Sequence, residues 1–232
     1  MLKLMDLLSE GVYDKGILKA VFMAGGPGSG KSHVAQASGV GKMSPYGLKV
    51  VDADPLFTKM LKAAGLSTKA DDIFSDKGQA IRDRAKAVTS RQEKNYMEGR
   101  LGLLIDGTGK DYNKIKKSSD SLRTLGYDTY MIFVNTTLEV ALERNENRDR
   151  VLPEKIVSDS HKEVNQNIGG FQGLFGGSNF MIVDNNKFQD EKQATKRFNM
   201  LVKQGLGKFI SKPLKNKRGL SWIRKNKILG KK

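Results

Sequence analysis

The stretch that decides the fold is FMAGGPGSGKSHV, residues 22–34. Four of the six residues from Gly25 to Gly30 are glycines, and a loop of this kind costs conformational entropy to order. Together with Lys31 and Ser32 they complete the pattern G-x-x-x-x-G-K-[ST], in which successive backbone N–H groups cradle phosphate oxygens. An apolar run precedes the loop and a helical pattern follows it, which is the context that this pattern requires. The stretch predicts a phosphate-binding loop, with a simple glycine linker as the alternative.

Each residue type in the loop has a role. The Lys31 ammonium can reach the β- and γ-phosphates, the Ser32 hydroxyl can ligate Mg²⁺, and the N-terminus of the following helix adds its dipole. We therefore expect ATP and Mg²⁺ as cofactors. The expected cofactor-binding residues are Gly25, Gly26, Pro27, Gly28, Ser29, Gly30, Lys31 and Ser32.

The chain around this loop alternates apolar runs with helical patterns. Continuous apolar runs, rather than alternating ones, are typical of a parallel sheet that is covered on both faces. The sequence thus predicts an α/β, doubly wound P-loop NTPase fold with helices on both faces of the sheet. The five expected strands are residues 18–24, 48–54, 100–109, 128–135 and 179–185.

The helical patterns are also specific enough to place. Residues 76–98 predict one long helix with Ile81, Ala85 and Val88 on its inner stripe, and residues 136–147 predict a helix capped by Thr136 or Thr137. A third helix is expected from Pro153 to about Ile168. The glycine-rich segment 169–177 is expected to be a flexible turn before the last strand.

The charge of the chain is unevenly distributed. Its 232 residues carry a net charge of +16, yet the last acidic residue is Glu191, and 14 Lys or Arg residues follow it. The sequence contains no cysteine, which excludes disulfides and thiolate metal sites. We expect three regions: an N-terminal amphipathic helix at 1–16, a kinase-sized domain at 17–190, and a basic C-terminal helix and tail at 191–232. No stretch predicts a membrane span, so a cytoplasmic protein is expected.

Three carboxylates lie at the ends of two of the predicted strands. Ligands of open α/β sheets bind at the carboxyl ends of the strands, where Asp52 and Asp54 lie at the end of the second strand and Asp106 at the end of the third. Asp54 is predicted to orient and deprotonate an acceptor hydroxyl, or alternatively to cap a helix that begins at Pro55. Asp106 is predicted to support Mg²⁺, or alternatively to form a turn before Gly107.

Three arginines lie in LERNENRDRVLP, residues 142–153. Guanidinium groups stabilise the charge of a phosphoryl group in transit, so Arg148 and Arg150 are predicted catalytic residues and Arg144 a nucleotide-binding residue. Acidic residues interleave with these arginines, and the alternative is a solvated charged face.

The order of these landmarks resembles one family. VFMAGGPGSGKS, VVDADPLF, LLIDGTG and ALERNENRDRVLP, spread over residues 18–185, are similar to the landmarks of zeta-toxin-like and polynucleotide-kinase-like P-loop kinases, many of them from tailed phages. The resemblance implies a five-stranded parallel sheet in the order 2-3-1-4-5 and transfer of the ATP γ-phosphate to a hydroxyl. It assigns Asp54 as the acceptor-activating carboxylate, and Arg148 and Arg150 as lid arginines. Thr58 and Lys59 stand where the family often has a substrate-binding arginine.

These features predict an ATP-dependent kinase that acts on a nucleoside, a polynucleotide 5′-hydroxyl or a nucleotide sugar. The alternatives are a nucleic-acid-binding P-loop ATPase and a non-catalytic phage protein with a kinase fold. The basic segment from residue 192 to residue 232, with Phe209 and Trp222 among its cations, could bind nucleic acid, remain solvated or dock on a protein, or lie on an anionic membrane. If the protein is phage-encoded, its compartment would be the host cytoplasm.

Overall fold

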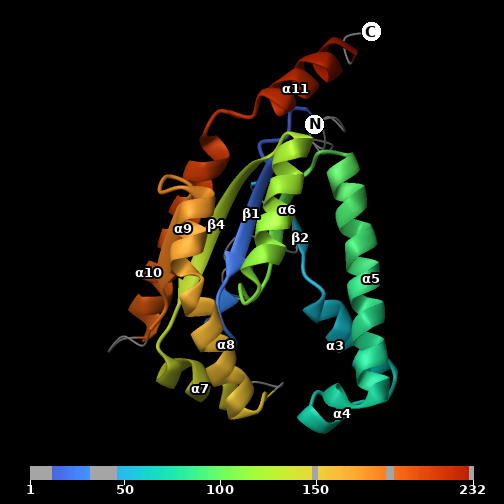
Figure 1. Cartoon of the computed structure of the whole chain (residues 1–232), viewed down its shortest axis with the longest axis vertical. Helices are drawn as coiled ribbons and strands as arrows, with labels where there is room; N and C mark the ends of the chain where they lie inside the picture. Colours follow the sequence, from blue (N-terminus) through green and yellow to red (C-terminus); the bar gives the residue numbers. More distant parts are fainter. Residues whose placement is uncertain (1–11, 32–45, 148–150, 187–190, 230–232) are drawn as a thin grey trace, which may run out of the picture.

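The computed structural model describes residues 12–31, 46–147, 151–186 and 191–229 (Figure 1). The strands are β1 (Lys19–Ala24), β2 (Leu48–Val51), β3 (Gly102–Asp106), β4 (Asp128–Asn135) and β5 (Phe180–Asp184). The helices are α3 (Asp54–Ala63), α4 (Ala70–Phe74), α5 (Asp76–Glu98), α6 (Tyr112–Leu125), α7 (Leu138–Glu146), α8 (Glu154–Gln166), α9 (Ile168–Phe175), α10 (Glu191–Ser211) and α11 (Lys217–Leu229).

The five strands form one parallel sheet in the order β2-β3-β1-β4-β5. The five predicted strands and their order are therefore confirmed. The central strand β1 is buried along its whole length, as expected of a strand that pairs on both sides and is covered on both faces. Because all strands run the same way, their carboxyl ends meet at one end of the molecule, where α3, α4, α7 and α8 also lie (Figure 1).

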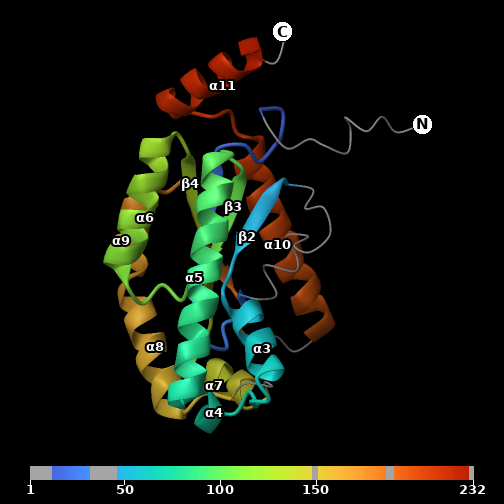
Figure 2. The same cartoon turned by 90° about the vertical axis from the view of Figure 1, so that its right-hand side faces the viewer.

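Helices cover the sheet from both sides (Figure 2). One face packs against α6, α9 and the last turns of α5, and its core includes Phe22, Met131 and Phe171. The other face packs against α10, whose buried side chains are Val202, Leu206, Phe209 and Ile210. Phe209 stacks on Tyr130 of β4 with ring centroids 4.6 Å apart. The helix that begins where the sequence predicts the basic segment to start thus buries apolar side chains in the core of the sheet.

A third, smaller cluster joins α3, α4 and α5 beyond the edge of the sheet. Phe57 and Leu61 of α3 pack there against Ile73 of α4 and Ala85 of α5. The long helix α5 occupies the predicted residues 76–98, and Ser75 caps it by accepting a hydrogen bond from the backbone of Gly78. Its predicted inner stripe is wrong in one place, because Val88 is 43% exposed while the neighbouring Thr89 is buried.

The glycine-rich segment before β5 is a correction to the prediction. It forms helix α9 instead of a flexible turn, with Phe171 and Phe175 buried against the sheet. The two phenylalanines lie four residues apart on one helical face, and the Phe175 ring lies 5.5 Å from that of Phe22. Burial of two large aromatic side chains outweighs the roughly 1 kcal/mol that each helical glycine costs.

Two further helical predictions are confirmed. Thr137 caps α7, and its side chain accepts a hydrogen bond from the backbone N–H of Val140. Helix α8 follows Pro153 and ends at Gln166. The predicted N-terminal helix lies almost entirely outside the described residues. Among the described residues, no helix combines the length and apolarity that crossing a bilayer requires.

Candidate active site at the carboxyl end of the sheet

The phosphate-binding loop follows β1 and turns tightly over α7. Gly25, Gly28 and Gly30 all have positive φ, at 155°, 78° and 91°. A Cβ on Gly28 would clash with the backbone of Ala141 in α7, because it would lie 2.8 Å from the Ala141 Cα. Glycine is required at position 28 by both conformation and space. The predicted tight glycine loop after the strand is thus consistent with the backbone, and the helix predicted to follow it lies outside the described residues.

Polar groups from two other segments bond to this loop, and an arginine of α7 supports one of them. The backbone N–H of Gly25 donates to the carbonyl of Thr108, which follows β3, at 3.0 Å. Asn185, just beyond β5, donates from its side-chain amide to the Ser29 carbonyl at 2.8 Å. Arg144 of α7 in turn donates to the Asn185 carbonyl at 2.7 Å. The loop is therefore pre-organised from both sides, which lowers the entropy cost of binding a ligand.

Lys31 lies in the mouth of the loop. Its Nζ donates to the carbonyls of Gly25 at 2.6 Å and Gly26 at 3.2 Å. The ammonium therefore lies where the loop curls, on the side of the acidic residues that follow β2 and β3. A flexible lysine stem can carry this point charge from the loop carbonyls to phosphate oxygens.

Asp106 is the most perturbed acid at this end of the sheet. Its pKa is raised to about 6, mainly by burial; the Lys31 ammonium opposes the rise, and the nearby carboxylates of Asp52 and Asp54 add to it. Its Oδ1 is buried and has no hydrogen-bond partner among the described residues. A buried carboxylate oxygen without a partner is costly and calls for a cation or a water as ligand.

Asp54 begins α3 but does not cap it. The N-cap position belongs to Ala53, and no side-chain cap hydrogen bond is formed there. The cap interpretation of Asp54 is therefore wrong. Its carboxylate is exposed, while its backbone N–H donates to Asp52 Oδ1 at 2.9 Å. Asp52 thus fixes the first turn of α3 and leaves the Asp54 side chain at the surface beside Asp106.

The donor set at this edge fits Mg²⁺ of the kind that nucleotides carry. Within the described ranges, no group of three or more His, Asp or Glu residues is close enough to hold a metal by itself. Mg²⁺ is commonly bound by one or two carboxylates together with substrate phosphates and waters, and the partnerless oxygen of Asp106 suits that role. The predicted second ligand, Ser32, lies outside the described residues.

The predicted lid arginines, Arg148 and Arg150, also lie outside the described residues. Arg144 is described, and its contact with Asn185 ties α7 to the loop after β5. No sequence pattern had indicated Asn185. Its position directly after the last strand is the signal that could have found it, because the carboxyl ends of neighbouring strands converge.

Helix α8 covers the remaining side of the loop. A Cβ on Gly26 would stand 3.6 Å from the Cα of His161. The His161 Nε2 lies 2.8 Å from the Thr136 carbonyl. Asn167, at the end of α8, donates to the Gly109 carbonyl at 2.9 Å. These contacts make α8 a structural support, with His161 in a packing role.

A protein-family model for zeta toxin matches residues 13–189 of the chain, from before β1 to beyond β5. The chain belongs to the zeta toxin family. The match spans the phosphate-binding loop, the acidic residues after β2 and β3, and Arg144. No curated protein sequence matched the chain significantly.

Solved structures support the same fold for this zeta toxin family member. A putative kinase from Chloroflexus aurantiacus has a TM-score of 0.56 at 15% identity, over 84% of this chain and 98% of that one. The PezAT toxin–antitoxin system of Streptococcus pneumoniae gives 0.51 at 14% identity, over 84% and 88%. AvrRxo1-ORF1:-ORF2 with ATP gives 0.57 at 15% identity, over 76% and 57%. The fold is that of P-loop kinases.

Proposed function

We propose that this protein is an ATP-dependent kinase that transfers the γ-phosphate to a hydroxyl group. The observation that carries the proposal is the acidic cluster beside the loop. Asp106 interacts electrostatically with Lys31, Asp52 and Asp54, so phosphate-binding and proton-accepting groups share one end of the sheet. A site that only hydrolysed ATP would have no need for a second, exposed carboxylate on α3.

Each group at the site has its own role in binding phosphate or metal. The loop from Gly25 to Gly30 binds phosphate oxygens through backbone N–H groups, and Lys31 moves from the loop carbonyls to the β- and γ-phosphates. Asp106 and Ser32 would hold Mg²⁺, which supplies charge neutralisation to the phosphates when it is bound. Arg144 keeps α7 and the loop after β5 in register with the phosphate site.

Asp54 acts on the acceptor. Its carboxylate orients the acceptor hydroxyl and takes its proton as the hydroxyl oxygen bonds to the γ-phosphorus. The bond between that phosphorus and the β–γ bridging oxygen breaks, and ADP leaves. Arg148 and Arg150 stabilise the charge of the transferred group. The acceptor belongs to the hydroxyl-bearing nucleosides, polynucleotide 5′ ends and nucleotide sugars.

Substitution of two residues separates binding from transfer. Lys31→Ala should abolish turnover of ATP. Asp54→Asn should retain ATP affinity and lose phosphoryl transfer by at least about 100-fold, the usual contribution of a general base. The matched control is Asp76→Asn, an exposed acid in the first turn of α5, which should leave both unchanged. Undiminished transfer by Asp54→Asn would refute the proposed base.

A further inference from the structure

Helix α11 has two different sides. Its inner side packs toward α6, where Gly219 is buried against Gly126, and Trp222 and Ile223 contact the core. Its outer side carries the exposed cations Lys217, Arg218, Arg224, Lys225 and Lys227. We call these five residues the α11 basic face. The apolar residues that interleave with the cations in the sequence are thus separated from them in space.

Three of the five cations on this face have no carboxylate partner in the part of the chain that the structure describes. Within the described ranges, Lys217, Arg224 and Lys225 have no carboxylate within ion-pair distance. Elsewhere the chain pairs exposed lysines along its helices, as Lys116 does with Asp120 at 2.7 Å. Clustered like charges destabilise a helix unless a partner offsets them. No acidic residue follows Glu191 in the sequence, so neighbours along α11 itself cannot offset these charges.

The turn that leads into α11 is rigidly held. Asp128, the first residue of β4, accepts hydrogen bonds from the backbone N–H groups of Lys215 at 2.9 Å and Asn216 at 3.1 Å. The buried Lys19 lies 3.5 Å from the same carboxylate. The Asn216 side chain donates to the carbonyls of Arg123 and Tyr127. The α11 basic face therefore has a fixed position relative to the sheet.

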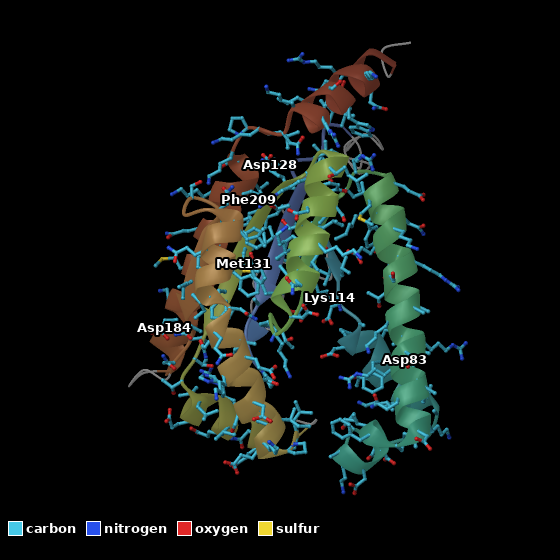
Figure 3. The ribbon with its side chains drawn as sticks, in the orientation of Figure 1. Asp83, Lys114, Asp128, Met131, Asp184 and Phe209 are labelled. Atoms are coloured by element: carbon cyan, nitrogen blue, oxygen red, sulfur yellow. The ribbon has the colours of Figure 1, made fainter. Side chains whose placement is uncertain are left out.

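A recess of about 360 Å³, lined by both apolar and polar side chains, lies beside this turn. Its lining includes the cationic side chains of Arg123, Lys212 and Lys215, and its acid is Asp128, whose carboxylate already serves Lys19 and the turn. Figure 3 shows Asp128 near α11, at the opposite end of the sheet from Asp184, which ends β5 beside the phosphate-binding loop. The cationic surface thus continues from the helix into the recess.

We propose that the α11 basic face and this recess bind the phosphodiester backbone of nucleic acid, at a site separate from the ATP site. A helix that lies on a membrane buries an apolar face in lipid, but Trp222 and Ile223 face the protein core. The outer side therefore offers cations spaced along about 15 Å of helix, which suits a regularly charged polyanion. Because Trp222 is packed inward, base stacking contributes little and binding is independent of sequence.

The test uses the full chain and a fluorescein-labelled 20-base-pair DNA duplex, with fluorescence anisotropy between 50 and 300 mM NaCl. The triple variant Lys217→Ala/Arg224→Ala/Lys225→Ala removes three phosphate contacts. Each contact contributes about 0.9 to the slope of log affinity against log salt. The slope should therefore become shallower by about 2.7, with an affinity loss of roughly 100- to 500-fold at 100 mM salt.

The matched control is Lys77→Ala/Arg84→Ala/Lys86→Ala, which removes the same residue types from exposed positions in the first half of α5. It should retain the wild-type slope, and both triple variants should retain ATP affinity, which shows that they are folded. Lys31→Ala should bind duplex normally, which separates this inference from the proposed kinase activity. Equal slopes for wild type and the α11 triple variant would overturn the proposal. So would binding of the wild type to anionic phosphatidylserine vesicles but not to duplex.

Discussion

Replacing Asp106 by asparagine should make the protein more stable and inactive. The carboxyl is buried, its Oδ1 has no partner among the described residues, and its pKa is raised to about 6 from an ordinary value of 3.8. Because the folded pKa lies above the unfolded one, ionisation costs stability as pH rises from about 4 to about 6, and the cost is constant above that. The asparagine amide does not titrate, so the variant escapes this cost.

The magnitude follows from the pKa difference. At about 1.4 kcal/mol per pKa unit, the full cost is roughly 3 kcal/mol, and about half of it develops between pH 5 and pH 7.5. The free energy of unfolding of Asp106→Asn minus that of wild type should therefore be larger at pH 7.5 than at pH 5, by about 1.4 kcal/mol. The change between pH values isolates the ionisation, because the amide's own packing contributes equally at both.

The assay is urea unfolding with EDTA and without nucleotide, followed by circular dichroism at pH 5 and pH 7.5. Asp83→Asn, on exposed α5, is the control for loss of one negative charge. If the stability difference between Asp106→Asn and wild type did not change with pH, Asp106 would ionise as a solvated carboxyl and its pKa would not be raised. Phosphoryl transfer by the variant should be lost in parallel.

Three further predictions follow from the fold. Gly28→Ala should weaken ATP binding by 10-fold or more, measured by calorimetry, because the new Cβ would meet the backbone of α7 at a positive φ; wild-type affinity would contradict this. Gly173→Ala should raise the free energy of unfolding by about 0.5–1 kcal/mol, since a Cβ there meets nothing within 4 Å, and a destabilised variant would show that α9 is not helical. Deletion after Glu191 should prevent folding, which would be seen as loss of the unfolding transition, because it removes four buried side chains of α10. Burial of each such side chain contributes about 1.5–3 kcal/mol, and the total stability of a domain is about 5–15 kcal/mol. A cooperative transition of that truncated chain would show that α10 is dispensable.

The sheet and the phosphate-binding loop were predictable because their signals are local. Continuous apolar runs mark buried parallel strands, and the spacing of Gly25 to Lys31 marks the loop. Thr137 likewise indicated the start of α7, because threonine is a common N-cap residue. Such features depend on residues that are close in sequence, and for these features the structure agrees closely with the prediction.

Features that depend on distant partners were not predictable. Helix α9 owes its stability to Phe171 and Phe175 packing on the sheet, which the glycines around them conceal. Asn185 supports the phosphate-binding loop because the strand order β1-β4-β5 brings the end of β5 within hydrogen-bonding reach of the loop that follows β1. The rise in the pKa of Asp106 likewise depends on burial by elements far away in the chain.

The fold of the basic segment could not be predicted from the sequence for the same reason. Its composition predicts a cationic tail, but the periodicity does not say which side chains face the core. Phe209 is buried under Lys19 and beside Tyr130, and Trp222 is packed toward α6. Only the structure separates the part that stabilises the fold from the part that remains exposed.

We expect the protein to transfer the γ-phosphate to a hydroxyl group and not to water. The most direct measurement is incubation of the protein with γ-³²P-ATP and Mg²⁺ against nucleosides, 5′-hydroxyl oligonucleotides and nucleotide sugars, with Lys31→Ala as the inactive control. Label should appear on one of these acceptors with the wild-type protein and on none with Lys31→Ala. Release of all label as inorganic phosphate, at a rate that no acceptor changes, would contradict this expectation.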